Sequence, residues 1–472
     1  MSPATARTLS YFAVKRGELI KRLDVTYNDP SITRKPTTQY ECENLGDLLE
    51  STYSGGTPDT SHPEYWEGDI PWISPKDFTG FYITDSQDYI SEQGRKAAKL
   101  KLVPSGSVLV VFRSGILKHT LPVALATKEV TVNQDIKVLI TRSALINAEY
   151  LANYLGINGA RLLPLITKHS TTVQSINSDQ FYELKIPIPP LEVQIELNKI
   201  LGQKRDSYYI KLAQADALLA ELDESILKEL GLTPPEEKEF KAFAANRGDL
   251  LGNRIDSFYH NPHFTKWVNT LESCPFGIVK LGDISPTLAG GATPRVDDAN
   301  LYTEKGVKFL RILNITPRGV DLSDVKYITK ETHEVSLSRS QLKANDVLMT
   351  ITGRVGTAAV VPDDILPANI NQHIVRLRVE RKDCLPEYLV AYLNCGIGIT
   401  LSNRSVTGGT RIALDYGAIR KIEIPLPPIK VQEKIISKID EVRVMSQCLR
   451  TKAHAEWAEA KASFEARLLG GE

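Results

Sequence analysis

The chain contains the same proline-rich segment twice. Residues 186–194 read Ile-Pro-Ile-Pro-Pro-Leu-Glu-Val-Gln, and residues 424–432 read Ile-Pro-Leu-Pro-Pro-Ile-Lys-Val-Gln. The shift is 424 − 186 = 238 residues, about half of the 472-residue chain. Solenoid repeats have periods of about 20–50 residues, so a repeat this long indicates two whole duplicated domains. A chain with two copies of one unit can contact two similar targets at a fixed distance.

Other segments repeat with nearly the same shift. Residues 133–136 match 371–374 at a shift of 238, and residues 45–47 match 281–283 at 236. Short insertions in surface loops explain this drift, because lengthening a loop costs little entropy. The segments between these anchors differ almost completely, so one scaffold with two different contents is the simplest interpretation.

Composition excludes several classes of protein. Apolar residues make up 42% and charged residues 24%, which is ordinary for a soluble globular protein. The net charge is zero, which argues against a disordered polybasic binder and leaves room for local positive patches. The five cysteines form no Cys-x-x-Cys pair, so we expect neither a disulfide framework nor a zinc site. Without a signal segment or an apolar run of about 18 residues, a soluble, cytoplasmic protein is expected.

A long helix is predicted after each proline-rich segment. Proline keeps the segment extended, whereas residues 191–230 contain no proline and only one glycine. Their apolar residues recur at helical spacing, and so do those of residues 431–469, among them Ile435, Ile439, Met445 and Trp457. Two helices of about 60 Å that pair antiparallel as a coiled coil are the favoured interpretation. The alternative is that each helix packs separately on its own domain.

A mixed α/β domain is predicted upstream of each proline-rich segment. Short apolar runs predict strands, and each sheet is interrupted by a short helix; the runs are 108–112, 138–140, 347–351 and 374–377, and the helices 148–155 and 386–393. The predicted class is α+β: two duplicated mixed α/β domains joined by two long antiparallel coiled-coil helices, with pseudo-twofold symmetry. The predicted boundaries are an N-terminal segment 1–38, domain 39–190, helix 191–232, linker 233–250, domain 251–428 and helix 429–470.

Catalytic signatures are missing from the sequence. It has no Gly-x-x-x-x-Gly-Lys-Ser/Thr loop, no Gly-x-Ser-x-Gly elbow, no His-Glu-x-x-His and no Asn-Pro-Pro-Phe/Tyr run. The eight histidines form no cluster with metal-ligand spacing. We therefore expect a chain that is not an enzyme by itself and that binds no metal.

The motifs that stand out resemble those of the specificity subunits of type I restriction–modification systems. Gly-Gly-Thr-Pro at 55–58, followed by Tyr-Trp-Glu-Gly-Asp-Ile-Pro-Trp-Ile at 65–73, looks like the start of a target-recognition domain. The duplicated proline-rich segment with its long helix is the other hallmark. The second copy departs from the first: Gly-Gly-Ala-Thr-Pro at 290–294 is interpreted as having an extra residue, and residues 303–310 replace the tryptophan-rich stretch.

The resemblance implies a mechanism. Each domain would read a short stretch of double-stranded DNA, largely through the major groove, so the target would be asymmetric and bipartite. The helix pair would set an unread spacer. The partners would be two DNA methyltransferase subunits and possibly restriction subunits. S-adenosylmethionine and ATP would bind those partners, and this chain would hold no cofactor.

Basic and polar residues in loops after predicted strands are the candidate DNA contacts. A guanidinium flanked by glycines can reach guanine or phosphate, as Arg354 could in Thr-Gly-Arg-Val-Gly. The other candidates are Lys76, Arg113, Lys118, His119, Arg311 and Asn314. The alternative for each is a solvated loop residue without a DNA contact.

Two further groups of residues are assigned structural roles. The Asn-Gln pairs at 133–134 and 371–372 could read adenine, but readers of two different half-sites should differ, so side-chain to backbone bonding is favoured. Trp66 and Trp72 are expected in the core. Trp457 is expected in the helix seam or against a methyltransferase.

Three alternative functions stay open. The same reader could serve a methylation-only or another phage-defence complex. The duplicated domains could instead form a bivalent scaffold that holds protein subunits and never reads bases. A fused enzyme with a diverged active site is the third. Steep salt dependence of DNA binding would argue against the scaffold, and S-adenosylmethionine binding by the isolated chain would favour the enzyme.

Overall fold

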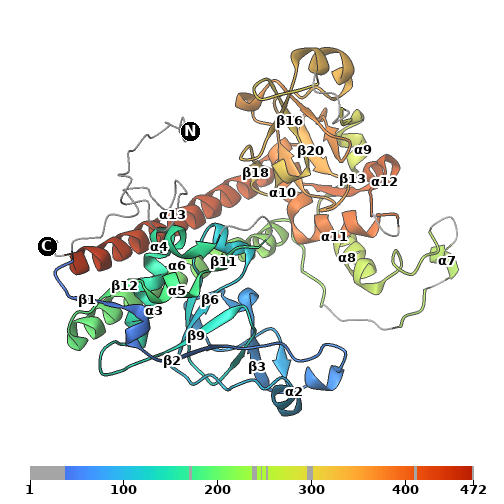
Figure 1. The fold of residues 1–472 in the computed structure, drawn as a ribbon. Helices are drawn as coiled ribbons and strands as arrows, with labels where there is room; N and C mark the ends of the chain where they lie inside the picture. The colour runs from blue at the N-terminus through green and yellow to red at the C-terminus, as the bar shows by residue number, and fades with distance from the viewer. Residues whose placement is uncertain are drawn as a thin grey trace. The chain divides into compact units, whose positions relative to one another are not determined.

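The computed structural model describes residues 38–168, 173–236, 242–245, 247–250, 254–294, 301–408 and 412–469. The chain forms two compact units, and each contains one α/β domain with parts of both long helices (Figure 1). Unit 1 comprises the described residues up to Ile210 and from Lys452 onward, and unit 2 runs from Lys211 to Thr451. The predicted N-terminal segment, except Thr38, and parts of the predicted linker lie outside the described residues.

Unit 1 contains a five-stranded sheet in the order β2-β9-β6-β7-β4. All neighbours are antiparallel except β4 and β7. The strands are β2 (Leu49–Ser54), β4 (Tyr82–Ile83), β6 (Val108–Val111), β7 (Val123–Ala126) and β9 (Ile136–Thr141). All four residues of β6 are buried, as expected for a central strand with an unbroken apolar run. A smaller sheet, β5-β3-β8, contains β5 (Tyr89–Ile90), β3 (Ile70–Ile73) and β8 (Thr131–Val132).

Unit 2 repeats this arrangement. Its antiparallel sheet has the order β14-β23-β20-β21, with β14 (Leu288–Gly290), β23 (Ile374–Leu377), β20 (Val347–Thr350) and β21 (Ala358–Val360). Its second sheet has the order β15-β19-β16-β22, with β15 (Tyr302–Thr303), β19 (Lys326–Ile328), β16 (Val307–Leu310) and β22 (Ala368–Ile370). The strands predicted around 108, 138, 347 and 374 are therefore confirmed.

Short helices share a hydrophobic core with the first sheet of each unit, which is β2-β9-β6-β7-β4 in unit 1 and β14-β23-β20-β21 in unit 2. In unit 1 these are α3 (Ala148–Ile157), α4 (Gly159–Ile166) and α5 (Ser178–Tyr182), and in unit 2 α10 (Pro386–Asn394), α11 (Gly396–Arg404) and α12 (Tyr416–Lys421). The helices predicted at 148–155 and 386–393 are confirmed by α3 and α10. Each proline-rich segment begins in a separate two-stranded antiparallel sheet: β12 (Lys185–Pro187) pairs with β1 (Cys42–Asn44), and β24 (Glu423–Leu426) pairs with β13 (Gly277–Lys280).

The two long helices are α6 (Leu191–Glu229) and α13 (Ile429–Leu469). Each begins directly after a proline pair. Gly231, with φ of +69°, ends α6, and the amide of Leu232 donates to the carbonyl of Leu227 at 2.8 Å. A left-handed glycine with this hydrogen bond is the Schellman ending, and Leu232 is buried as that motif favours.

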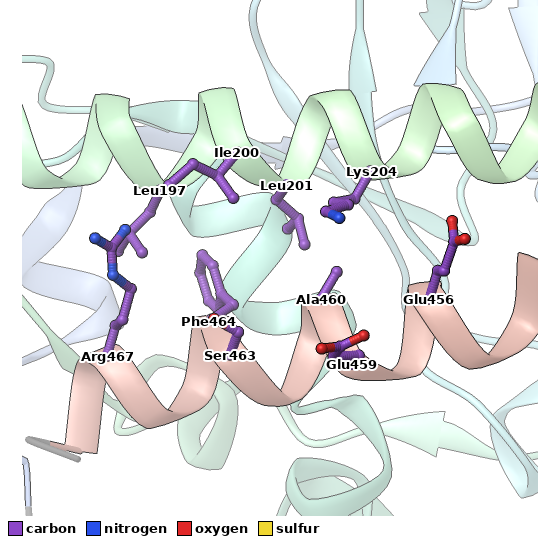
Figure 2. A pocket seen from close by; sticks show the side chains of 10 residues that line it. All are labelled: Leu197, Ile200, Leu201, Lys204, Glu456, Glu459, Ala460, Ser463, Phe464 and Arg467. Atoms are coloured by element: carbon purple, nitrogen blue, oxygen red, sulfur yellow. The ribbon is translucent and has the colours of Figure 1, made fainter. Parts of the chain in front are cut away.

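In unit 1, α6 and α13 pair antiparallel. Glu196 forms an ion pair with Arg467 at 3.1 Å, and the Tyr208 hydroxyl lies 3.5 Å from the His454 Nδ1 atom. Figure 2 shows Leu197, Leu201 and Phe464 facing one another between the helices, in a pocket of about 130 Å³ with charged residues at its rim. The three side chains belong to one core that also contains the buried residues of α3 and α4.

In unit 2 the same helices also pair antiparallel. Lys434 forms an ion pair with Glu229 at 2.8 Å, and the Ser446 hydroxyl donates to the carbonyl of Ala215 at 2.9 Å. The predicted coiled-coil pairing is confirmed. One seam residue was predicted wrongly, because the side chain of Met445 is 54% exposed while Ser446 is buried. A small side chain at that position lets the backbones approach closely, which the apolar spacing did not indicate.

Candidate nucleic-acid interface

In each unit, two neighbouring strands of the second sheet are parallel and end at the same edge of that sheet. In unit 1 these are β3 and β8, and in unit 2 they are β16 and β22. The residue after the second strand donates its amide to the last residue of the first: Asn133 to the carbonyl of Ile73 at 2.9 Å, and Asn371 to the carbonyl of Leu310 at 3.0 Å. The loops that follow these strands are thus held side by side, and they carry three of the seven predicted site residues: Lys76, Arg311 and Asn314.

The loop after the first strand is closed by the same cap in both units. In unit 1 the Asp77 carboxylate accepts from the amide of Ser74 at 2.8 Å. In unit 2 the Asn314 side-chain oxygen accepts from the amide of Arg311 at 2.8 Å. Both shifts are equal, since 311 − 74 = 314 − 77 = 237. These contacts match the two loops residue by residue.

Asn314 is therefore a correction to the predicted DNA contacts. Its side chain is buried, and its amide nitrogen donates to the carbonyl of Asp321 at 2.8 Å. A buried amide with its donors and acceptor satisfied holds the loop and presents nothing to a ligand. Arg311 is partly exposed, and its guanidinium donates to the Asp324 carboxylate at 2.8 Å, so an acidic partner already holds it.

Lys76 lies at the tip of this loop in unit 1, and its counterpart in unit 2 is Leu313, since 313 − 76 = 237. The Lys76 ammonium forms an ion pair with Asp88 at 2.7 Å, and this hydrogen bond raises its pKa. Leu313 is 63% exposed, so its apolar side chain faces solvent. The same backbone thus presents a cation in one unit and an apolar side chain in the other.

The side-chain to backbone bonding predicted for the two Asn-Gln pairs is confirmed for the asparagines and wrong for the glutamines. The Asn133 side-chain oxygen accepts from the amide of Asp135 at 3.0 Å, and that of Asn371 accepts from the amide of His373 at 3.2 Å. Each glutamine has a different partner. Gln134 accepts from the Thr57 hydroxyl at 2.6 Å, and Gln372 accepts from the Thr293 hydroxyl. The threonine of each Gly-Gly-Thr-Pro or Gly-Ala-Thr-Pro segment is thereby tied to the edge.

The register of the second copy is also resolved. A Cβ atom on Gly55 would lie 1.6 Å from the carbonyl oxygen of Val132, and one on Gly291 would lie 1.9 Å from that of Ile370. Gly55 therefore corresponds to Gly291 at a shift of 236, and Ala292 takes the place of Gly56. The extra residue predicted in this segment was wrong: the first glycine of the second copy, Gly290, is the last residue of strand β14.

The third residue of the Asn-Gln turn differs between the units. In unit 1 the Asp135 carboxylate accepts from the Arg113 guanidinium at 2.8 Å. In unit 2 the corresponding residue is His373, whose Nδ1 atom lies 2.9 Å from the Thr352 hydroxyl. In both units the turn is also bonded to the loop that follows the central strand, β6 or β20. In unit 1 the amide of Phe112 donates to the carbonyl of Asp135 at 2.7 Å, and in unit 2 the amide of Ile351 donates to the carbonyl of His373 at 3.0 Å.

The other predicted contacts lie on these central loops. Arg113, Lys118 and His119 are exposed, and Lys118 ends the short helix η5 (Gly115–Lys118). Arg354 is exposed in the tight loop between β20 and β21, between Gly353 with φ of +68° and Gly356 with φ of +89°. A Cβ atom on Gly353 would lie 3.9 Å from Ile312, so this loop adjoins the one that carries Leu313.

Comparison with known proteins identifies the family. The model described as "Type I restriction modification DNA specificity domain" matches residues 38–213 and 275–448, one copy in each half of the chain. The chain belongs to this family. The expected resemblance is confirmed, and each matched copy contains the sheets of one α/β domain.

Relatives of the chain are specificity subunits. The chain is 34% identical over 204 residues to that of the type I restriction enzyme EcoR124I/EcoR124II from Escherichia coli, covering 42% of this chain and 50% of the relative. It is 26% identical over 284 residues to that of EcoBI from Escherichia coli, covering 58% and 54%. The chain thus spans about half the length of these relatives.

One solved structure supports the fold. It comes from work on complex assembly and conformational transition of the type I R-M system, and it aligns with a TM-score of 0.54 at 16% identity. The alignment covers 91% of this chain and 96% of the other. At this identity the likeness concerns the fold alone.

The tryptophans lie largely where they were predicted. Trp72 is buried and donates its indole N–H to the carbonyl of Gly56 at 2.9 Å. Trp66 packs edge-on against it with ring centroids 5.0 Å apart. Trp457 packs in the helix seam of unit 1, 6.0 Å from the ring of Tyr208. In the described part of the chain, no helix combines the length and apolar character needed to cross a membrane.

The glutamine that ends each proline-rich segment has a role that was not predicted from sequence. Gln194 is fully buried, donates to the carbonyl of Pro189 at 2.8 Å and accepts from the amide of Asn147 at 2.8 Å. Gln432 does the same with Pro427 at 2.8 Å and Leu385 at 2.9 Å. Each glutamine joins its long helix to the start of the helix that covers the sheet. The sequence feature that could have indicated this role is the presence of the glutamine at the same position in both proline-rich segments.

Proposed function

We propose that this chain is the DNA-reading subunit of a type I restriction–modification complex and that its two target-recognition domains read the two halves of an asymmetric, interrupted target. The observation that carries the proposal is the edge that is built twice with different side chains at corresponding positions. The caps, turns and hydrogen bonds are duplicated, whereas Lys76 is replaced by Leu313 and Asp135 by His373.

These substitutions change what each edge can recognise. An arginine or lysine donates to the O6 and N7 atoms of guanine or to phosphate, whereas an apolar side chain favours the methyl group of thymine. Asp135 holds the Arg113 guanidinium in unit 1, and Arg354 is exposed on the matching loop of unit 2. Different chemistry on one scaffold supports two different half-sites.

Two methyltransferase subunits are the proposed protein partners, with restriction subunits as further proposed partners. Exposed apolar side chains on the long helices support docking there, among them Ile195 and Ile210 in unit 1 and Val444 and Met445 in unit 2. S-adenosylmethionine and ATP would bind those partners. The chain alone is proposed to be non-catalytic and to act in the cytoplasm.

Selection from a pool of randomised duplexes tests the reading role. The chain in complex with its methyltransferase partners should enrich sequences with two fixed blocks around an unread gap, and its affinity should fall steeply with salt as phosphate contacts are screened. Enrichment of no sequence, together with affinity that ignores salt, would favour the protein scaffold. Binding of S-adenosylmethionine by the isolated chain would favour the fused enzyme.

A further inference from the structure

One arginine on each long helix contacts a recognition domain. These are Arg205 on α6 and Arg443 on α13, and their shift, 443 − 205 = 238, is that of the proline-rich segment. Each contacts the loop that follows the first strand of the edge in its own unit. That loop is residues 74–81 in unit 1 and residues 311–318 in unit 2, where it includes the short strand β17 (Ile315–Thr316).

Arg205 is a buried cation, with only 3% of its side chain exposed. Its guanidinium lies over the ring of Phe81, 3.5 Å from the ring centroid. One terminal nitrogen donates to the side-chain oxygen of Asn153, and the other lies 3.7 Å from the Glu149 carboxylate. Burial lowers the pKa of Arg205, because the charged form loses hydration.

The network closes on the loop from its other end. Tyr82, which directly follows the loop, donates its hydroxyl to the Glu149 carboxylate at 2.7 Å. Burial and this carboxylate raise the pKa of Tyr82 to about 12. Arg205 on α6 therefore stacks on Phe81, and Glu149 on α3 accepts the hydrogen bond from Tyr82. The end of the loop is thus fixed to both helices.

Arg443 reaches the same loop in unit 2 by a simpler contact. Its guanidinium donates to the carbonyl of Pro317 at 2.6 Å. By the shifts of 237 and 238 that apply to these segments, Phe81 corresponds to Arg318 and Asn153 to Ala391. The arginine is thus repeated although its side-chain partners are not. In both units, an arginine on the long helix contacts the loop.

We propose that Arg205 and Arg443 are positioning residues that fix each recognition loop to its long helix, and so set where Lys76 and Leu313 meet the DNA. This inference rests on the proposed reading function. A buried ion pair is weak as a source of stability, since apolar packing of the same volume often stabilises as well. Directional hydrogen bonds and ring contacts fix a loop in one conformation, which apolar packing does less well.

Substitution by lysine should have different effects at the two positions. A lysine ammonium at position 443 can still donate to a single carbonyl oxygen, so Arg443→Lys should keep the loop in place. At position 205 the contact needs a planar cation that stacks on Phe81, donates to Asn153 and lies near the Glu149 carboxylate, which lysine does not supply. Arg205→Lys should therefore behave like Arg205→Ala.

The test uses the chain in complex with its methyltransferase partners and three duplexes: the selected target, and the target with either block scrambled. In Arg205→Ala and Arg205→Lys, discrimination against one scrambled block should fall about ten-fold, the size of one lost base-pair contact. Arg443→Ala should affect the opposite block, and Arg443→Lys should stay within about three-fold of the parent, below the cost of one mismatch. Gln203→Ala and Gln447→Ala, exposed on the same helices, are the matched controls.

Hydrogen exchange supplies a measurement that needs no DNA. Arg205→Ala should speed exchange in residues 74–81 without changing 311–318, and Arg443→Ala should do the reverse. Phe81→Leu keeps apolar volume but removes the stacked ring, so it covers the case in which Arg205→Ala does not fold. Unchanged exchange, or equal loss at both blocks, overturns the positioning role. A parent complex that discriminates against neither scrambled block would instead overturn the reading function.

Discussion

Replacing Gln194 with leucine should destabilise unit 1 and leave unit 2 unchanged. The change removes a fully buried amide and leaves the amide of Asn147 and the carbonyl of Pro189 without partners. A buried polar group that loses its hydrogen bond costs about 1–3 kcal/mol, so two such groups, less a small gain from apolar burial, give about 2–4 kcal/mol. The Leu145 carbonyl, bonded at 3.3 Å, is left out because its residue is 47% exposed and water can replace the bond.

Hydrogen exchange resolved by peptide is the assay, since it gives a free energy of opening for each unit separately. Peptides of α3 should exchange faster in Gln194→Leu, and those of α10 should not; Gln432→Leu should give the opposite pattern. Gln203→Leu, exposed on the same helix, should change the free energy by less than about 0.5 kcal/mol. A loss below 1 kcal/mol, or one shared equally by both units, would refute the assigned role.

Three further predictions concern stability and reactivity. Gly55→Ala should lower stability by at least about 2 kcal/mol, because its Cβ would lie 1.6 Å from a backbone oxygen, whereas Gly156→Ala has open space and should not destabilise; the urea midpoint reports both. Burial raises the pKa of Cys384 and Cys395 to about 12, so an alkylating reagent at pH 8 should modify the exposed Cys448 first, and mass spectrometry showing equal rates in the native protein would contradict this. A hydrogen bond from Arg95 lowers the pKa of Glu92 from 4.5 to about 2, so its contribution is present above pH 4.5 and lost as the pH falls toward 2; Glu92→Gln should flatten this part of an acid-unfolding curve, and an unchanged curve would count against the pair.

The duplication in the sequence was sufficient to predict the architecture. The shift of 238 residues located both domains and both long helices, and apolar runs located the central strands β6 and β20. These features depend on hydrophobic period and proline, which act locally and leave a clear pattern. The seam position taken by Ser446 in place of Met445 was not predictable in this way, because it depends on how closely the two backbones approach.

The candidate interface was predicted only in part. Loop position identified Lys76, Arg113 and Arg354 as exposed cations, but it could not show that Asn314 caps its own loop. That role depends on a hydrogen bond to a neighbouring backbone amide, which residue type alone does not reveal. Leu313 was missed for a related reason, since an isolated leucine in a sequence gives no sign of being exposed.

The reading role is tested most directly by comparing DNA methylation in the host with and without this gene, by modification-sensitive sequencing. Deletion should remove adenine methylation at one asymmetric, interrupted motif. Arg354→Ala should relax only one of the two blocks of that motif. An unchanged methylation pattern, with the partner methyltransferase expressed, would contradict the claim that this chain chooses the target.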